Sequence, residues 1–202
     1  MHSMLSSIFM AGLCLAMSPG AQAADGMIIW PAGWEVESIP QEPAKTAPPR
    51  LDTPRPAESA VASPPTDKPL IQLRQRALKN DANGNPAMVM ELTQSRLQQG
   101  HKVNVEGVLL AMRKAVQVNF VRTGFQSVCT KMKDTTLSSF AAMETTCTIT
   151  QNGVHMMTQT LVAAASEDTA WSLSYAGSAQ GYADNKDEVA GIRESLRLNV
   201  SP

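Results

Sequence analysis

Hydrophobic and polar residues alternate along the chain after Gly124, which is the pattern of half-buried β-strands. Residues 125–132 form the first such run, and residues 171–175 (WSLSY) form the last. Between them, two long strand-like runs flank Asn152–Gly153, a dipeptide that tolerates the positive φ angles of a type I′ turn. We therefore predict an antiparallel meander over residues 125–178.

A two-residue turn at Asn152–Gly153 would also fix the register of its hairpin. The predicted pairs are Ile149 with Met156, Cys147 with Thr158, and Met143 with Val162. These pairs give the hairpin a mostly apolar side, which we expect to face the core.

Elsewhere, apolar residues recur at three- and four-residue spacing, which predicts helices. Asn85–Pro86 and Asn104 are typical helix starts, and Gly100 and Gly124 are typical helix ends. The expected helices span residues 69–79, 86–99, 105–123 and 182–196.

The N-terminal part is predicted to contain two short strands, at residues 27–30 and 35–39, joined by a turn at 31–34. Residues 43–69 then hold eight of the thirteen prolines and almost no large apolar residues, which is typical of a linker. The expected organisation is an N-terminal strand segment (24–42), a Pro-rich linker (43–69) and an α+β domain (70–202).

Residues 1–23 have the features of a signal peptide. The apolar run at 4–17 is too short to span a bilayer, and Ala21-Gln22-Ala23 fits a signal-peptidase site before Ala24. Leu13, directly before Cys14, argues against a lipid anchor, because lipid modification requires a small residue there. We therefore expect a periplasmic or secreted protein with no membrane span after cleavage.

Cleavage would leave two cysteines, Cys129 and Cys147. In an oxidising compartment two cysteines most simply form a disulfide, and the chain-entropy model gives such a bridge a stabilisation of about 3 kcal/mol. No C-x-x-C redox motif is present, so we expect a structural bridge.

The 202 residues carry a net charge of −1, with 43% hydrophobic and 17% charged residues. This composition is typical of one globular domain with additional extended segments. A nucleic-acid-binding function is excluded at this stage, because neutralising phosphates requires a surplus of Lys and Arg.

The sequence offers no convincing catalytic centre. Only His101 and His155 would survive maturation, and both are expected to be solvated polar residues rather than bases. Residues 177–181 (GSAQG) lack the G-x-S-x-G spacing of a nucleophile elbow. We predict no catalytic residues.

Two segments resemble metal sites superficially. His155-Met156-Met157 has copper-ligand residue types, but neighbouring residues on a strand point to opposite faces and cannot converge on one ion. Residues 81–85 resemble the start of a calcium loop, but Pro86 stands where an EF-hand requires Gly. We therefore predict neither metals nor cofactors.

Four features together resemble the PsbP-like α/β/α sandwich. They are Pro31-Ala32-Gly33-Trp34, the meander, the strand at 171–175 and the closing segment 192–196 (IRESL). The resemblance covers residues 26–40 and 85–198 and implies an α+β fold with an antiparallel sheet packed against helices. More narrowly, the sequence is similar to an uncharacterised group of secreted proteins from Pseudomonas-like bacteria, which implies no site residues.

The leading functional hypothesis is a non-enzymatic module of the cell envelope that binds another envelope protein. One alternative is a small-molecule or lipid carrier with a pocket between sheet and helices. Another is a hydrolase of unrecognised type, built on carboxylates such as Glu35, Glu37 and Glu144. Trp30 and Trp34 could form a binding edge, although burial under a helix is the more ordinary expectation for them.

Overall fold

The computed structural model describes residues 26–39 and 70–198. It contains an eight-stranded antiparallel sheet, a separate two-stranded sheet and three helices. The elements are β1 (Gly26–Met27), β2 (Trp34–Ser38), β3 (Leu70–Asn80), β4 (Pro86–Arg96), α1 (Val105–Arg122), β5 (Gln126–Cys129), β6 (Lys133–Leu137), β7 (Phe140–Gln151), β8 (Val154–Ala165), β9 (Thr169–Ser178), α2 (Ala179–Asp184), α3 (Lys186–Ser195) and β10 (Arg197–Leu198).

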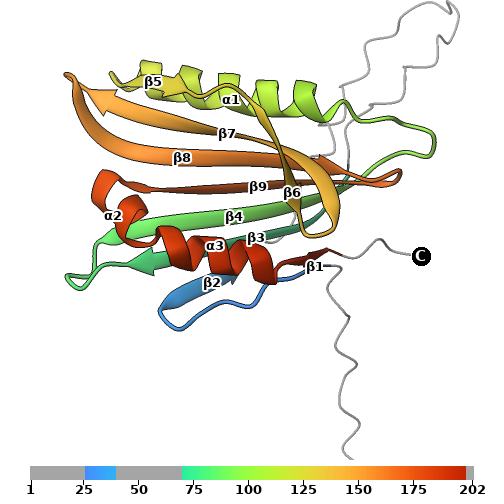
Figure 1. Cartoon of the computed structure of the whole chain (residues 1–202), viewed down its shortest axis with the longest axis horizontal. Helices are drawn as coiled ribbons and strands as arrows, with labels where there is room; N and C mark the ends of the chain where they lie inside the picture. Colours follow the sequence, from blue (N-terminus) through green and yellow to red (C-terminus); the bar gives the residue numbers. More distant parts are fainter. Residues whose placement is uncertain (1–25, 40–69, 199–202) are drawn as a thin grey trace, which may run out of the picture.

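The large sheet has the order β2-β3-β4-β9-β8-β7-β5, and β6 also pairs with β7. Figure 1 shows α1 alongside β5 and β7, and α3 across the other part of the sheet. Successive residues of β8 separate the two layers, because Leu161 and Ala163 pack with α1 whereas Val162 and Ala164 pack with α3. The molecule is therefore an α/β/α sandwich, and the predicted α+β fold class is confirmed.

The larger core lies between the sheet and α3. It is built around Trp171 and Leu173 of β9, Leu92 of β4, and Val189 and Ile192 of α3, all of which are buried. The smaller core lies under α1, where Leu109 is fully buried. At roughly 25 cal/mol per Å² of buried apolar surface, these two layers supply most of the driving force for folding.

The helices predicted at 69–79 and 86–99 are wrong. Both segments are strands, β3 and β4, which form a long hairpin closed by residues 81–85. In β4 the buried residues Met88, Met90 and Leu92 recur every second position, and this alternation outweighs the helix-start appearance of Asn85–Pro86. Pro86 instead begins the strand, a position at which a missing N–H is tolerated.

The turn at Asn152–Gly153 is present, with φ angles of 51° and 78° at these two residues. The predicted register holds only next to the turn, because an irregularity between Ile149 and Thr150 shifts the strands by one residue. The pairs in the structure are Ile149 with Met157, Cys147 with Gln159, and Met143 with Ala163.

The predicted helix at 105–123 is present as α1, and Asn104 caps it by accepting a hydrogen bond from the Gly107 N–H. The closing helix differs from the prediction, because it is split into α2 and α3 at Asn185. The Asn185 side chain donates to the Gly181 carbonyl at 2.7 Å and thereby ends the first segment. β10 then pairs with β1 and brings the two ends of the described chain together.

The predicted signal peptide (1–23) and linker (43–69) lie outside the described residues. Of the N-terminal strand segment, β2 pairs with β3 at the edge of the large sheet. In the described part of the chain, no helix combines the length and apolar character needed to cross a membrane.

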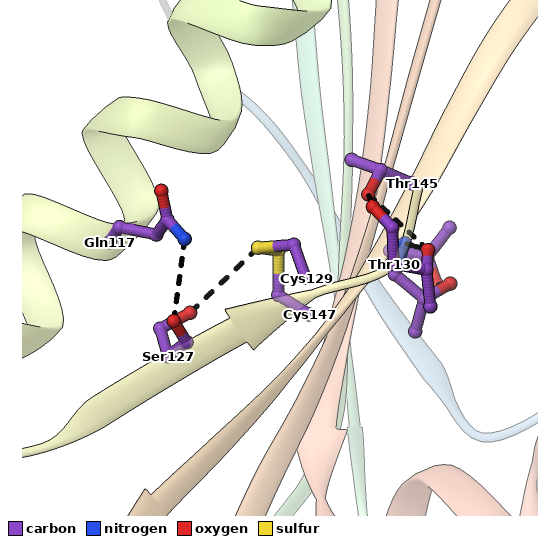
Figure 2. Close-up of a disulfide and its surroundings, with 8 residues drawn as sticks. Gln117, Ser127, Cys129, Thr130, Thr145 and Cys147 are labelled. Atoms are coloured by element: carbon purple, nitrogen blue, oxygen red, sulfur yellow. Dashed lines mark hydrogen bonds between the residues drawn. A yellow bond between two sulfur atoms is a disulfide. The ribbon is translucent and has the colours of Figure 1, made fainter. Parts of the chain in front are cut away.

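Cys129 and Cys147 lie opposite each other on β5 and β7 and are joined by a disulfide, with Cα atoms 3.9 Å apart. Figure 2 shows Gln117 of α1 reaching this region, where its side chain donates to the Ser127 carbonyl at 3.4 Å. Directly after the bridge, the Thr145 hydroxyl donates to the Thr130 carbonyl at 2.9 Å. The bridge thus fastens the short edge strand β5 to the sheet beneath α1.

Candidate functional site

A cavity of about 890 Å³ lies beside α3, on the face of the sheet that this helix covers, and we call it the α3 cavity. Strands β7, β8 and β9 form its floor, α2 and α3 form one wall, and the β6–β7 turn and β10 close one end. The lining residues are Met88, Thr135, Thr136, Ser138, Ser139, Glu144, Thr146, Thr160, Tyr175, Tyr182, Lys186, Val189, Ala190, Arg193, Glu194, Arg197 and Leu198. Most of the polar ones carry hydroxyl groups.

An ion-pair cluster crosses the α3 cavity. The Arg193 guanidinium donates to one oxygen of Glu144 at 2.6 Å, and Lys133 lies 2.9 Å from the other oxygen. Glu144 is 9% exposed, so water screens its pair with Arg193 only weakly, whereas the Lys133 side chain is largely exposed. Burial opposes the charge on Glu144, but hydrogen bonds and charges from Lys133 and Arg193 outweigh burial and hold its pKa below the ordinary value.

Arg193 also holds the β6–β7 hairpin against α3. Its second terminal nitrogen donates to the Thr135 hydroxyl at 2.7 Å and to the Thr136 carbonyl at 3.0 Å. At the same end, the Leu198 N–H donates to the Ser138 hydroxyl at 3.3 Å. The hairpin, the helix and the last strand are therefore fixed relative to one another around the cavity.

A chain of hydroxyl groups lies on the cavity floor. The Thr160 hydroxyl is 2.8 Å from that of Thr146 and 2.6 Å from that of Tyr182. Burial raises the pKa of Tyr182 to about 12, so its phenol is neutral at physiological pH. The ring of Tyr182 stacks on Tyr175, with centroids 6.0 Å apart. This region can therefore offer hydrogen bonds and aromatic surface, but no negative charge.

The sequence of α3 explains how the helix presents this wall. Val189 and Ile192 face the core, while Lys186, Ala190 and Arg193 recur at spacings of four and three and line the cavity. Glu188 anchors the helix from another side: it accepts from the Trp34 indole at 2.9 Å and from Lys79. Burial opposes the charge of Glu188, but these two donors lower its pKa overall.

The anchoring contact also decides between the two predictions for the tryptophans. Trp34 is 8% exposed, and its ring lies 5.7 Å from that of Trp30, which packs against the same core. Trp34 is therefore buried and bonded to α3, and Trp30 is partly buried beside it, which agrees with the expectation of burial under a helix.

The carboxylates proposed for a hydrolase are not brought together. Glu35 and Glu37 are exposed on edge strand β2, whereas Glu144 lies in the α3 cavity. Within residues 26–39 and 70–198, no three His, Cys, Asp or Glu side chains are grouped so that they could hold a metal ion. A general base works best with a pKa near neutrality, whereas the ion pairs lower the pKa of Glu144 and move it away from neutrality.

Both histidines are exposed and lie outside the α3 cavity. The His155 ring is 2.9 Å from the Thr158 hydroxyl, and its neighbour Met156 is 42% exposed. His101 lines a second, smaller cavity of about 570 Å³ between the start of α1 and strands β4 and β9. Ser178, in the segment that lacks the nucleophile-elbow spacing, caps α2 by accepting from the Gly181 N–H.

The loop that resembles a calcium site is a hairpin turn. The Asp81 carboxylate accepts the backbone N–H groups of Asn83 and Asn85 at 2.8 and 2.9 Å. Both bonds go to Oδ1, which thus holds the β3–β4 connection, as expected for an Asx turn.

Sequence analysis identified Glu144 but missed its partners, Arg193 and Lys133, and the hydroxyl chain. One available signal was Glu144 itself, because Ala142, Glu144 and Thr146 share one face of a strand on which a lone charge requires compensation. The identity of the compensating groups depends on how β6 and α3 dock, which residue spacing does not encode.

Comparisons with known proteins identify a family and a fold that this chain resembles. A family model described as "Domain of unknown function (DUF4946)" matches residues 49–198. No curated protein matches the sequence. The chain is similar to the solution structure of cyanobacterial PsbP (CyanoP) from Synechocystis sp. PCC 6803, with a TM-score of 0.54 and 8% identity over 86% of each chain. It is also similar to LpqN of Mycobacterium tuberculosis, described as involved in cell envelope biogenesis, with a TM-score of 0.49 and 14% identity over 88% of this chain and 83% of that chain. The likeness to CyanoP confirms the predicted PsbP-like fold.

Proposed function

We propose that this chain, which belongs to the DUF4946 family, is a non-enzymatic binding protein of the cell envelope that holds a small organic molecule in the α3 cavity. The observation that carries the proposal is the cavity. Its volume of about 890 Å³ lies within the range of ligand pockets, about 300–1,000 Å³. Among the functions considered from sequence, this one corresponds to the small-molecule carrier.

The lining supports binding rather than catalysis. Tyr175, Tyr182, Met88 and Val189 supply apolar contact, while threonine and serine hydroxyls supply a few directed hydrogen bonds. The least exposed charges of the lining, on Glu144 and Arg193, neutralise each other and fix the walls. A site whose walls are held before the ligand arrives loses less entropy when it binds.

The envelope location rests on other features. Residues 1–23 have the composition of an export signal, and the Cys129–Cys147 disulfide is favoured by an oxidising compartment. The narrower resemblance to secreted proteins of Pseudomonas-like bacteria agrees with this location.

A protein partner, the leading hypothesis from sequence, is the second candidate. One specific observation favours it: α1 exposes Leu110, Val118 and Val121 on the side turned away from the sheet, with Val121 64% exposed. Crosslinking in intact cells followed by capture of the chain would test it. If the wild-type chain captures an envelope protein in a one-to-one ratio and the Leu110→Ser/Val121→Ser variant does not, this candidate is supported. If the variant captures the same protein equally well, α1 is not the binding surface.

The carrier proposal is tested with N-phenyl-1-naphthylamine, a neutral dye that fluoresces when it enters an apolar site. We expect saturable binding of one dye molecule per mature chain. Ala190→Phe, which adds a ring to the helix wall that lines the α3 cavity, should weaken binding at least tenfold. Ala183→Phe is the matched control, because Ala183 is exposed on α2 outside the cavity lining. Equal dye binding by both variants, with unchanged circular dichroism, would refute the proposal.

A further inference from the structure

The charges around the α3 cavity are unbalanced. Among the lining residues, three cations, Lys186, Arg193 and Arg197, face two carboxylates, Glu144 and Glu194. The whole chain, by contrast, has a net charge of −1. A cavity lined by a surplus of one sign raises the local concentration of ligands of the opposite sign.

The surplus lies on Lys186 and Arg197. Arg193 and Lys133 both pair with Glu144, whereas neither Lys186 nor Arg197 enters an ion pair among the described residues. One terminal nitrogen of Arg197 donates to the carbonyls of Glu194 and Leu196, which holds the side chain in place. Its other terminal nitrogen and its Nε make no hydrogen bond within the described structure, so part of the guanidinium fork is available.

The end of the cavity near Arg197 also offers hydroxyl donors. Ser138 and Ser139 form the β6–β7 turn there, and Arg193 lies on the same wall. A guanidinium with adjacent hydroxyl donors is a common arrangement for a carboxylate, sulfonate or phosphate group. The stacked pair of Tyr175 on the floor and Tyr182 on the α2 wall lines the cavity, and the body of a ligand would rest against it.

We propose that the α3 cavity selects an organic anion, with the acidic group at Arg197 and the apolar body against the tyrosine pair. This inference rests on the proposed function, because it specifies the ligand class of the same cavity. Lys186 contributes long-range attraction at the opposite end of the helix wall. Glu194 opposes binding, but the cations remain in excess.

The test compares two dyes that share one ring skeleton. 8-Anilinonaphthalene-1-sulfonate differs from N-phenyl-1-naphthylamine by a single sulfonate. Exposed ion pairs change affinity by up to about fivefold each, so two cations predict roughly tenfold tighter binding of the sulfonate at low salt. Arg197→Gln should remove several-fold of this preference, measured as the ratio of the affinities of the two dyes for the same variant. The matched control is Arg122→Gln, because Arg122 is an exposed cation on α1 that does not line the cavity.

The outcomes separate the two proposals. Equal affinities for both dyes, each lost in Ala190→Phe, would overturn the anion preference while leaving the carrier function intact. Equal effects of Arg197→Gln and Arg122→Gln would likewise overturn the role of Arg197. Failure of both dyes to bind, or binding that Ala190→Phe does not change, would overturn the carrier function itself.

Discussion

Replacing Arg193 by methionine removes the side chain that ties α3 to the β6–β7 hairpin. The wild-type guanidinium donates three hydrogen bonds, of which one goes to the carboxylate of Glu144. Breaking a buried ion pair by removing one partner costs about 3–5 kcal/mol, but Glu144 would keep its contact with Lys133. The Lys133 contact offsets part of this cost, but only part, because the Lys133 side chain is 70% exposed. We therefore expect Arg193→Met to lower the unfolding free energy by about 2–3 kcal/mol.

A double-mutant cycle isolates the pair. Glu144→Gln alone leaves Arg193 without its anion, and the double variant Glu144→Gln/Arg193→Met removes both charges. The cost of the double variant should be about 1–2 kcal/mol less than the sum of the single variants. Urea unfolding followed by tryptophan fluorescence measures these values, since Trp171 is 1% exposed in the folded chain.

The surface pair between Arg74 and Glu91 provides the control. Its partners are 3.0 Å apart, but the Arg74 side chain is 45% exposed, so Arg74→Met should cost less than about 1 kcal/mol. If Arg193→Met costs no more than Arg74→Met, or if the Glu144 and Arg193 variants are additive, the cluster does not brace the cavity.

Three further predictions follow from single features of the structure. The pKa of Glu144 is held below its ordinary value of 4.5, so the unfolded chain binds the proton first as the pH falls. The contribution of Glu144 to the unfolding free energy should therefore be fully present above about pH 5 and be lost as the pH falls below it. Thermal unfolding measured across this pH range should show a smaller loss of stability in Glu144→Gln than in the wild-type chain. Cys129→Ala/Cys147→Ala should lower the unfolding free energy by about 3 kcal/mol in urea titrations, and an unchanged midpoint would contradict a stabilising bridge. Gly181→Ala should cost about 1–3 kcal/mol by calorimetry, because its Cβ would come within 2.5 Å of the Ala87 carbonyl. Gly191→Ala, in an open position on α3, should instead stabilise by about 0.5–1 kcal/mol, and the same sign for both glycines would refute the close packing of α2 on β4.

The parts of the fold that local sequence could predict are those with one unambiguous period. Residues 171–175 alternate strictly, and α1 has both a capping asparagine and a helical apolar stripe. Leu70, Leu73 and Ala77 also have helical spacing, yet they lie on β3. That segment becomes a strand because it pairs with β4 in a hairpin and with β2 on its other side, and the spacing of residues within the segment encodes neither pairing.

The site was less accessible to sequence reasoning for the same reason. Glu144 could be identified as a carboxylate, but Arg193 follows it by 49 residues and belongs to another layer. Tyr182 appeared only as the expected start of a helix, and its link to Thr160 exists because α2 folds back over β8. Side chains that meet through tertiary docking leave no local pattern to read.

Native mass spectrometry of the full chain recovered from the cell envelope tests the central claim most directly. We expect wild-type protein and Ala183→Phe to carry one organic molecule per chain, and Ala190→Phe to carry none. Wild-type protein that always appears at the mass of the polypeptide alone, or a bound molecule retained by Ala190→Phe, would contradict a ligand in the α3 cavity.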